Sequence, residues 1–93
     1  MKKFVKVFYL QGNGEQEFFM PVGAEILTVQ VRIDGGPCIC VSYTPSNAVE
    51  KRRFYVIPDN GEIDCDKAKE IKYIGSFQLV YYINCHVFEL IGE

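Results

Sequence analysis

The sequence predicts a small all-β domain, an antiparallel barrel or sandwich of about seven strands that occupies residues 1–93. Short apolar segments recur about every ten residues, turn residues separate them, and no segment shows a convincing ten-residue helical period. Several segments are apolar on both faces, which suits a closed barrel or a sheet covered by a second subunit better than an open sheet. At most one short helical turn is expected.

The composition indicates one packed globule. The 93 residues are 48% hydrophobic, include six tyrosines and seven phenylalanines, and carry a formal net charge of −2. A chain of this length can bury one modest core and has no room for a second. The negative balance gives no global attraction to phosphate or anionic lipid, which disfavours nucleic acid as the main partner.

The first residues resemble a secretory signal only superficially. Lys2 and Lys3 precede an apolar run, but Lys6 interrupts it and no small-residue cleavage site follows before Glu15. No segment approaches the ~18 apolar residues that span a bilayer. We therefore expect a cytoplasmic protein without a membrane partner, in which the four cysteines are reduced.

The first strand is expected at Phe4–Leu10, where side chains alternate between two faces. Residues 12–14, Gly-Asn-Gly, have turn chemistry, and a returning strand is expected over Glu17–Met20. Pro21 ends this strand, because proline has no amide for a ladder. These two strands are predicted to form a first hairpin.

A second hairpin spans residues 23–44 and is the strongest such signal in the chain. Apolar side chains alternate along its first strand, and residues 34–37, Asp-Gly-Gly-Pro, reverse the chain. A loop of two or four residues would put Cys38 and Cys40 on the face of Val29 and Val31. A three-residue loop with a bulge would instead place Ile39, Val41 and Tyr43 opposite Val31, Val29 and Leu27. We favour the second register because it buries bulkier side chains.

The second half of the chain is expected to add three strands. After a loop at residues 44–47 and a turn within Ala48–Arg52, the expected strands are Arg53–Ile57, Lys72–Tyr82 and Ile83–Ile91. Residues 62–70 form a polar loop, with the one helical turn expected near Asp66–Glu70. Gly75 predicts a bulge or a close backbone approach, and Tyr81–Asn84 is the expected turn between the last two strands.

Neither catalysis nor a metal site is indicated. Cys85 and His86 are adjacent, so on a strand their side chains point to opposite faces and cannot form a dyad. His86 is the only histidine, and its apolar neighbours predict a half-buried, hydrogen-bonded ring. Cys38 and Cys40 lack the usual knuckle spacing of zinc ligands. We expect no enzyme, no metal and no cofactor, with Cys38, Cys40 and Cys85 acting as small buried hydrophobes and Cys65 as a loop thiol.

The acidic stretch and the glycine pair also have structural interpretations. Asp59, Glu62, Asp64 and Asp66 lack the spacing of a calcium loop, so a solvated acidic loop is expected. Gly12 and Gly14 precede a strand, unlike a dinucleotide fingerprint, and are interpreted as a turn.

Binding residues are expected among the tyrosines and the basic run. Tyrosine combines apolar area with a polar tip, which favours interfaces. Residues 51–53, Lys-Arg-Arg, are the only dense basic run and lie beside aromatic residues. The run is interpreted as a solvated face or as a patch for an acidic protein. The candidate binding residues are Tyr43, Arg53, Tyr55, Tyr73 and His86.

Several motifs resemble a family of short, uncharacterised bacteriophage and prophage proteins. The resemblance covers residues 18–89 and depends on the segments at 20–30 (MPVGAEILTVQ), 37–38 (PC), 53–54 (RF), 73–78 (YIGSFQ) and 86–89 (HVFE). Relatives carry a Thr-Gly-His loop where this chain has Asp59, Asn60 and Gly61, and often an aromatic residue at Cys40. The resemblance implies a phage or prophage origin and action in the bacterial cytoplasm, but no known activity.

These observations predict a non-enzymatic binding protein that contacts a host or phage protein, for example one of defence or regulation. The alternative is a barrel that binds a small ligand or nucleotide, with Arg53 holding an anion and Tyr43, Tyr55 or Tyr73 stacking. A weaker alternative is a zinc-stabilised domain. Exposed strand edges make a homodimer a further expectation.

Overall fold

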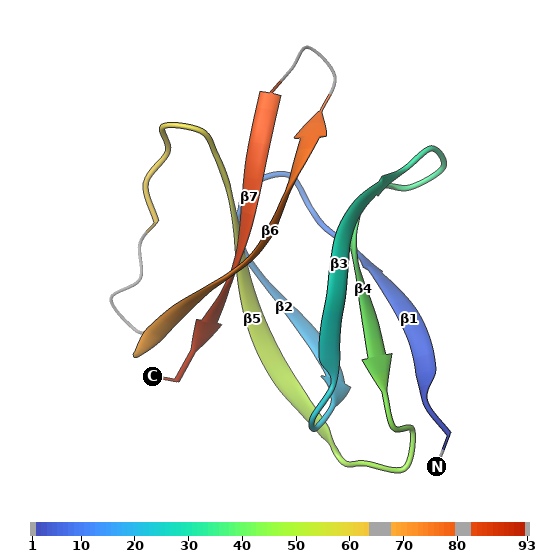
Figure 1. Cartoon of the computed structure of the whole chain (residues 1–93). Coiled ribbons are helices and arrows are strands. Elements are labelled where there is room, and N and C mark those ends of the chain that lie inside the picture. The colour runs from blue at the N-terminus through green and yellow to red at the C-terminus, as the bar shows by residue number, and fades with distance from the viewer. Residues whose placement is uncertain (1, 64–67, 80–82, 93) are drawn as a thin grey trace.

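The computed structural model describes residues 2–63, 68–79 and 83–92 and shows seven strands in two antiparallel sheets. The all-β prediction is confirmed, and no helix occurs in these ranges. The sheets pack as a sandwich and do not join into a closed barrel (Figure 1). The strands are β1 (Phe4–Tyr9), β2 (Gly14–Pro21), β3 (Glu25–Arg32), β4 (Gly36–Tyr43), β5 (Val49–Pro58), β6 (Glu70–Leu79) and β7 (Ile83–Ile91).

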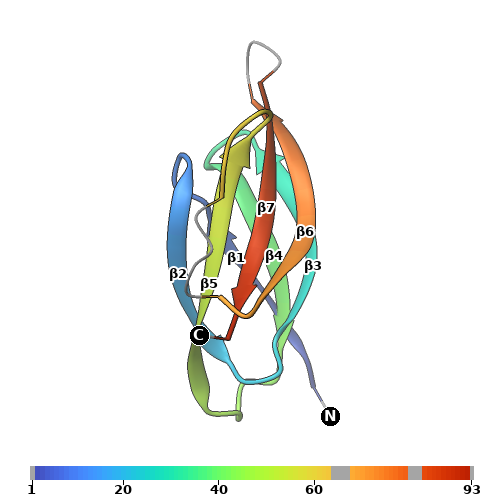
Figure 2. The ribbon, with the colours of Figure 1, turned by 90° about the vertical axis from the view of Figure 1, so that its left-hand side faces the viewer.

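The two sheets divide the chain in an order that the sequence did not reveal. Sheet A has the order β1-β4-β3 and sheet B the order β2-β5-β7-β6. Figure 2 looks onto sheet B with sheet A behind it. The predicted first hairpin is wrong, because β1 pairs with β4 and β2 pairs with β5. The Gly-Asn-Gly segment reverses the chain as expected, but it carries the chain across from one sheet to the other.

A side chain closes this connection between β1 and β2. The Gln11 amide donates to Oε1 of Gln16 at 2.8 Å, and Nε2 of Gln16 donates to the Gln11 carbonyl at 2.6 Å. Gly14 has a φ of 100°, which glycine adopts without strain. The Gln16 side-chain amide thus satisfies the backbone groups of Gln11, which in a tight hairpin would bond to other backbone groups. β2 begins at Gly14, three residues earlier than predicted.

The hairpin of β3 and β4 has the predicted faces but not the predicted register. Three residues, 33–35, connect the strands, and Ile39 lies opposite Val29 instead of Val31. The bulge lies within β3, between Ile26 and Thr28, so Ile26 faces Val41 and Leu27 is 51% exposed. Because the shift is two residues, Ile39 and Val41 still point into the core.

The boundaries of the later strands differ from the prediction. The segment expected to hold a turn, Ala48–Arg52, belongs mostly to β5, which begins at Val49. The bulge predicted at Gly75 is confirmed by a register shift between Tyr73 and Gly75 against β7. Ile83 and Asn84 are strand residues. The rest of the expected turn, at 81–82, and the first two residues of the expected helical turn, at 66–67, lie outside the described residues, whereas residues 68–70 are not helical.

The core fills the space between the inner faces of the two sheets. Ile39 and Val41 of sheet A meet Phe54, Val56 and Val87 of sheet B, and all five are 0% exposed. Burial of these side chains stabilises the sandwich by a generic value of about 25 cal/mol per Å² of apolar surface. Alternation along each sheet B strand then directs the intervening side chains outward.

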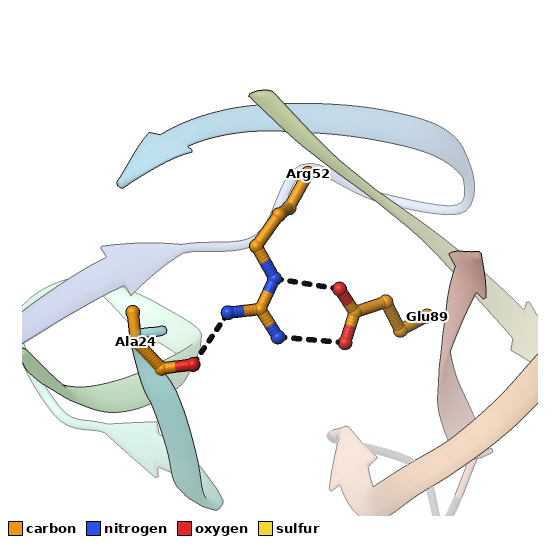
Figure 3. A network of polar contacts seen from close by, with 3 residues as sticks. All are labelled: Ala24, Arg52 and Glu89. Atoms are coloured by element: carbon orange, nitrogen blue, oxygen red, sulfur yellow. Dashed lines mark hydrogen bonds and ion pairs between the residues drawn. The ribbon is translucent and has the colours of Figure 1, made fainter. Parts of the chain in front are cut away.

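Arg52 joins an ion pair within sheet B to a hydrogen bond that reaches sheet A at one end of the sandwich. Arg52 of β5 donates through Nε and Nη2 to the Glu89 carboxylate of β7 at 2.6 and 2.8 Å. Its Nη1 donates to the carbonyl of Ala24, just before β3, at 2.5 Å (Figure 3). The Glu89 hydrogen bonds raise the pKa of Arg52, so the guanidinium stays charged. Every described buried side-chain polar atom has a partner.

Candidate binding site

The outer face of sheet B brings together four of the five predicted binding residues. Tyr55 lies opposite Phe88, which lies opposite Tyr73 on the other side of β7. His86 precedes Phe88 by two residues and so lies on the same face, and Arg53 precedes Tyr55 by two residues in the same way. We call this surface, defined by Tyr55, Tyr73, His86 and Phe88, the aromatic face.

Tyr43 lies elsewhere. It is on the inner face of sheet A, packed against the core, and its ring centroid is 6.0 Å from that of Phe4. The structure therefore separates Tyr43 from the other four predicted residues.

A chain of hydrogen bonds runs across the aromatic face. The Tyr73 hydroxyl lies 3.1 Å from Nδ1 of His86, and Nε2 of His86 lies 2.5 Å from Oδ1 of Asp59. When Nε2 carries the proton and donates to Asp59, Nδ1 accepts from the tyrosine. His86 is thus the half-buried, hydrogen-bonded ring that the sequence predicted, with a side chain 32% exposed.

The position of Asp59 is fixed from β7. Its amide donates to the Asn84 carbonyl at 3.0 Å, and the Asn84 side-chain amide lies 3.4 Å from Oδ2 of Asp59. The segment after β5 is therefore held by polar contacts against the end of the aromatic face. An aromatic contact also orients Tyr73, because its ring centroid lies 5.1 Å from that of Phe88 in an edge-on arrangement.

The Asp59 carboxyl provides a test of this chain. The hydrogen bond from His86 lowers the pKa of Asp59 below its ordinary value, and the hydrogen bond from Asn84 lowers it further by a smaller amount. The resulting stabilisation is present above the unfolded-state pKa of about 3.9 and is lost as the pH falls through the lower folded-state pKa. We expect an NMR titration of the Asp59 carboxyl carbon to show a depressed midpoint, which H86L returns toward the ordinary value. Y73F keeps the imidazole in place and should leave the depression; equal midpoints in H86L and the parent protein would refute the assignment.

A hollow of about 440 Å³ adjoins this chain. Its apolar lining includes Ile57, Ile63 and Phe88, and His86 and Asp59 are polar groups in its wall. One wall is the segment 58–62, where the Gly61 amide donates to the Pro58 carbonyl at 3.1 Å. A Cβ at Gly61 would lie 2.6 Å from Cγ1 of Ile57, so this turn can pack closely only with glycine. The hollow is mainly apolar and has polar groups on one side.

Lys51 and Arg53 of the basic run each lie beside a carboxylate of β2. Nη2 of Arg53 donates to the Gly92 carbonyl at 2.9 Å, and its Nη1 lies 3.6 Å from the Glu15 carboxylate. Lys51 lies 3.4 Å from Glu17. Since these glutamates of β2 offset both cations, an acidic protein or a phosphate would have to displace them. This geometry weakens the two anion-binding interpretations of the run.

The three described cysteines do not gather at one site. Cys38 and Cys40 lie on the outer face of sheet A, whereas Cys85 lies in the core between the sheets. Burial raises the pKa of the Cys38 and Cys85 thiols, which disfavours the thiolate needed by a metal or a nucleophile. Among the residues that the structure describes, no cluster of three or more metal-ligating side chains forms. Cys65, Asp64 and Asp66 lie outside those residues.

Two contributors to the site were not singled out from the sequence. Phe88 is absent from the predicted binding residues, although strand alternation places it with His86 and not with Val87. Asp59 was treated as a solvated loop residue, and no local pattern connects it to His86, 27 positions later. Alternation along β7 was the one available signal, whereas the Asp59 contact depends on the path of the chain after β5.

Comparison with known proteins identifies a family but no function. None of the described segments is a helix long and apolar enough to cross a membrane. No curated protein matches the chain, and no solved structure does. One family model, described as a domain of unknown function, matches residues 1–93. The chain therefore belongs to the DUF7352 family.

Proposed function

We propose that this protein is a non-enzymatic binding module that recognises another protein through the aromatic face and its hollow. The observation that carries the proposal is the hollow itself, a mainly apolar depression lined in part by His86 and Asp59, with Tyr73 hydrogen-bonded to His86 beside it. Aromatic anchors beside a pocket that excludes water are the usual source of binding energy in protein interfaces.

The chemistry of the site favours a particular kind of partner. The hollow can take one apolar side chain, and the Asp59 carboxylate beside it can accept a hydrogen bond from the partner's backbone or side chain. Tyr73 is 53% exposed and supplies both ring surface and a hydroxyl. A protein loop that projects an aliphatic or aromatic side chain next to an amide donor meets these requirements. A nucleotide is disfavoured, because Arg53 is already paired.

We further propose a biological setting from the sequence resemblance. The motifs at residues 20–30 and 73–78 resemble those of short bacteriophage and prophage proteins. In this proposal the protein acts in the cytoplasm of a bacterial host and binds a host protein, for example one of defence or regulation. The small size and the net charge of −2 of this chain are compatible with a protein that diffuses freely and binds such a target.

The test compares matched single substitutions in capture from host lysate. Y73A removes an exposed aromatic ring from the site, whereas F19A removes one of comparable exposure, 67%, from the opposite edge of sheet B. A partner bound through the site should be captured by the parent protein and by F19A, but lost with Y73A. With the purified partner, truncation of an aromatic anchor is expected to weaken Kd about 30-fold or more.

Three results would contradict the proposal. The first is a capture profile that is identical for the parent protein and Y73A, with both folded by circular dichroism. The second is a partner lost equally with Y73A and F19A. The third is a concentration-dependent rise in melting temperature with nucleotides at millimolar concentration, which would favour the small-ligand alternative.

A further inference from the structure

β1 forms a free edge of sheet A that carries a single charge, Lys6. β1 is the last strand of sheet A, and no described strand lies beyond it (Figure 1). Its sequence, FVKVFY, has one charge and no proline. Val5 is 64% exposed and Tyr9 40% exposed. Such an edge normally pairs with another chain unless charges, proline or a covering segment prevent it.

One hydrogen bond shows which backbone groups of β1 point away from β4. The Leu10 amide donates to the Pro37 carbonyl at 2.9 Å, in line with the register of β1 on β4. Because backbone groups along an antiparallel strand point alternately to either side, Val5, Val7 and Tyr9 direct theirs away from β4. The edge therefore presents three amide donors and three carbonyl acceptors without a strand to receive them.

The edge of β2 is protected, which makes the contrast informative. The Val22 amide donates to the Ala48 carbonyl at 2.7 Å, so the outward-pointing residues there are Glu15, Glu17, Phe19 and Pro21. Two carboxylates and a proline are typical guards of an edge.

The remaining two edges lie beside each other. β3 and β6 adjoin where the sheets meet, as Figures 1 and 2 both show, and a Cβ at Gly75 would lie 3.0 Å from Cγ2 of Val29. Each of these strands thus covers the approach to the other. Among the described strands, β1 is therefore the edge with no adjoining edge, no proline and only one charge, Lys6.

We propose that β1 pairs antiparallel with β1 of a second copy of this chain, centred on Val7. In this register Val7 faces Val7 of the second copy, and Val5 faces its Tyr9. All outward amides of 5, 7 and 9 then find a carbonyl, giving six hydrogen bonds between the copies. The two three-stranded sheets A become one continuous sheet.

The side chains of β1 are complementary to themselves in this register. On the outer face, a β-branched residue meets an aromatic one, which is a favourable cross-strand pair. On the inner face, Lys6 meets Phe8 of the second copy, and Lys6 already lies 5.2 Å from the Phe8 ring of its own chain. The two lysines are diagonal and not directly opposed, so the one charge of the strand does not oppose itself. This charge arrangement is what favours a second copy over an unrelated strand.

The oligomeric state of the full chain tests this inference. Light scattering after gel filtration should give twice the chain mass of 10.7 kDa at micromolar concentration. V7P removes an outward amide that β4 does not use, so the fold should persist and the mass should fall to that of a monomer. F19P makes the same change at the edge of β2 and should leave the dimer intact. A monomeric parent protein, or a V7P protein that is folded and dimeric, would overturn the inference.

A second variant covers the case in which V7P does not fold. V7K leaves the backbone unchanged and places two lysines directly opposite each other across the two-fold axis. Sedimentation should show at least a tenfold weaker dimer for V7K, and an unchanged dimer constant would count against the pairing. The aromatic face lies on the other sheet, so partner capture and oligomeric state can fail independently.

Discussion

Replacing Glu89 with leucine should lower the free energy of unfolding by about 3 kcal/mol, since it leaves the Arg52 guanidinium half-buried without its carboxylate. The Glu89 side chain is 8% exposed and that of Arg52 17% exposed. Removal of one partner from such a pair costs about 3–5 kcal/mol, and the residual exposure of Arg52 places this site at the lower end. Urea unfolding followed by circular dichroism measures this loss of unfolding free energy, provided that the denaturant slope m is the same in both proteins.

A double-mutant cycle separates the pair from simple loss of packing. R52M with E89L replaces both charges by apolar groups of similar size, and we expect the double variant to be more stable than either single variant. The Lys51 and Glu17 pair lies 3.4 Å apart on the outer side of the same sheet, with both side chains about half exposed, and is the matched control. Its coupling should be below about 1 kcal/mol. If the two couplings were equal, burial would not strengthen the Arg52–Glu89 pair.

The same pair shows where sequence reasoning stopped short of the structure. Placing the start of the fifth strand at Arg53 left Arg52 in a turn, so its direction could not be assigned. Once β5 begins at Val49, alternation sends Arg52 inward and Arg53 outward, and the basic run divides between two faces. The partners Glu89 and Ala24 come from segments distant in sequence. No local pattern could have identified them.

The pairing of strands was similarly beyond the sequence, although their existence was not. Alternation identified all seven strands, and glycine identified the bulge at Gly75, because both signals are local. The Gly-Asn-Gly segment indicates a reversal equally well for a hairpin and for a crossing between sheets. In the structure the chain crosses between sheets, and the Gln16 side chain satisfies the turn backbone at Gln11.

The candidate site was predicted in part for a comparable reason. Tyr55, Tyr73 and His86 were chosen by residue type, and strand parity then placed them on one face. Tyr43 was chosen on the same basis, but its parity directs it into the core. Residue type alone therefore could not distinguish an exposed binding tyrosine from a packing one.

Replacing Phe54 with alanine should cost about 3–5 kcal/mol of unfolding free energy, the range for a large aromatic residue in a packed core. Phe54 is 0% exposed, its ring lies 5.8 Å from that of Phe18, and it is among the largest fully buried side chains described. A loss of this size is a large fraction of the stability of a small domain, so F54A is expected to be partly unfolded at 37 °C. Thermal and urea unfolding of the purified variant measure it.

F19A is the matched comparison, because it makes the same chemical change on the adjacent strand of sheet B with the ring pointing outward. At 67% exposure the ring contributes little buried area, and we expect a change within about 0.5 kcal/mol. The difference in unfolding free energy between the two variants measures the stabilisation that a phenylalanine gains by lying between the sheets. Equal costs would imply that the inner faces do not enclose one core. The outward placement of Tyr55, Tyr73 and His86 follows from the same strand parity and would lose its basis as well.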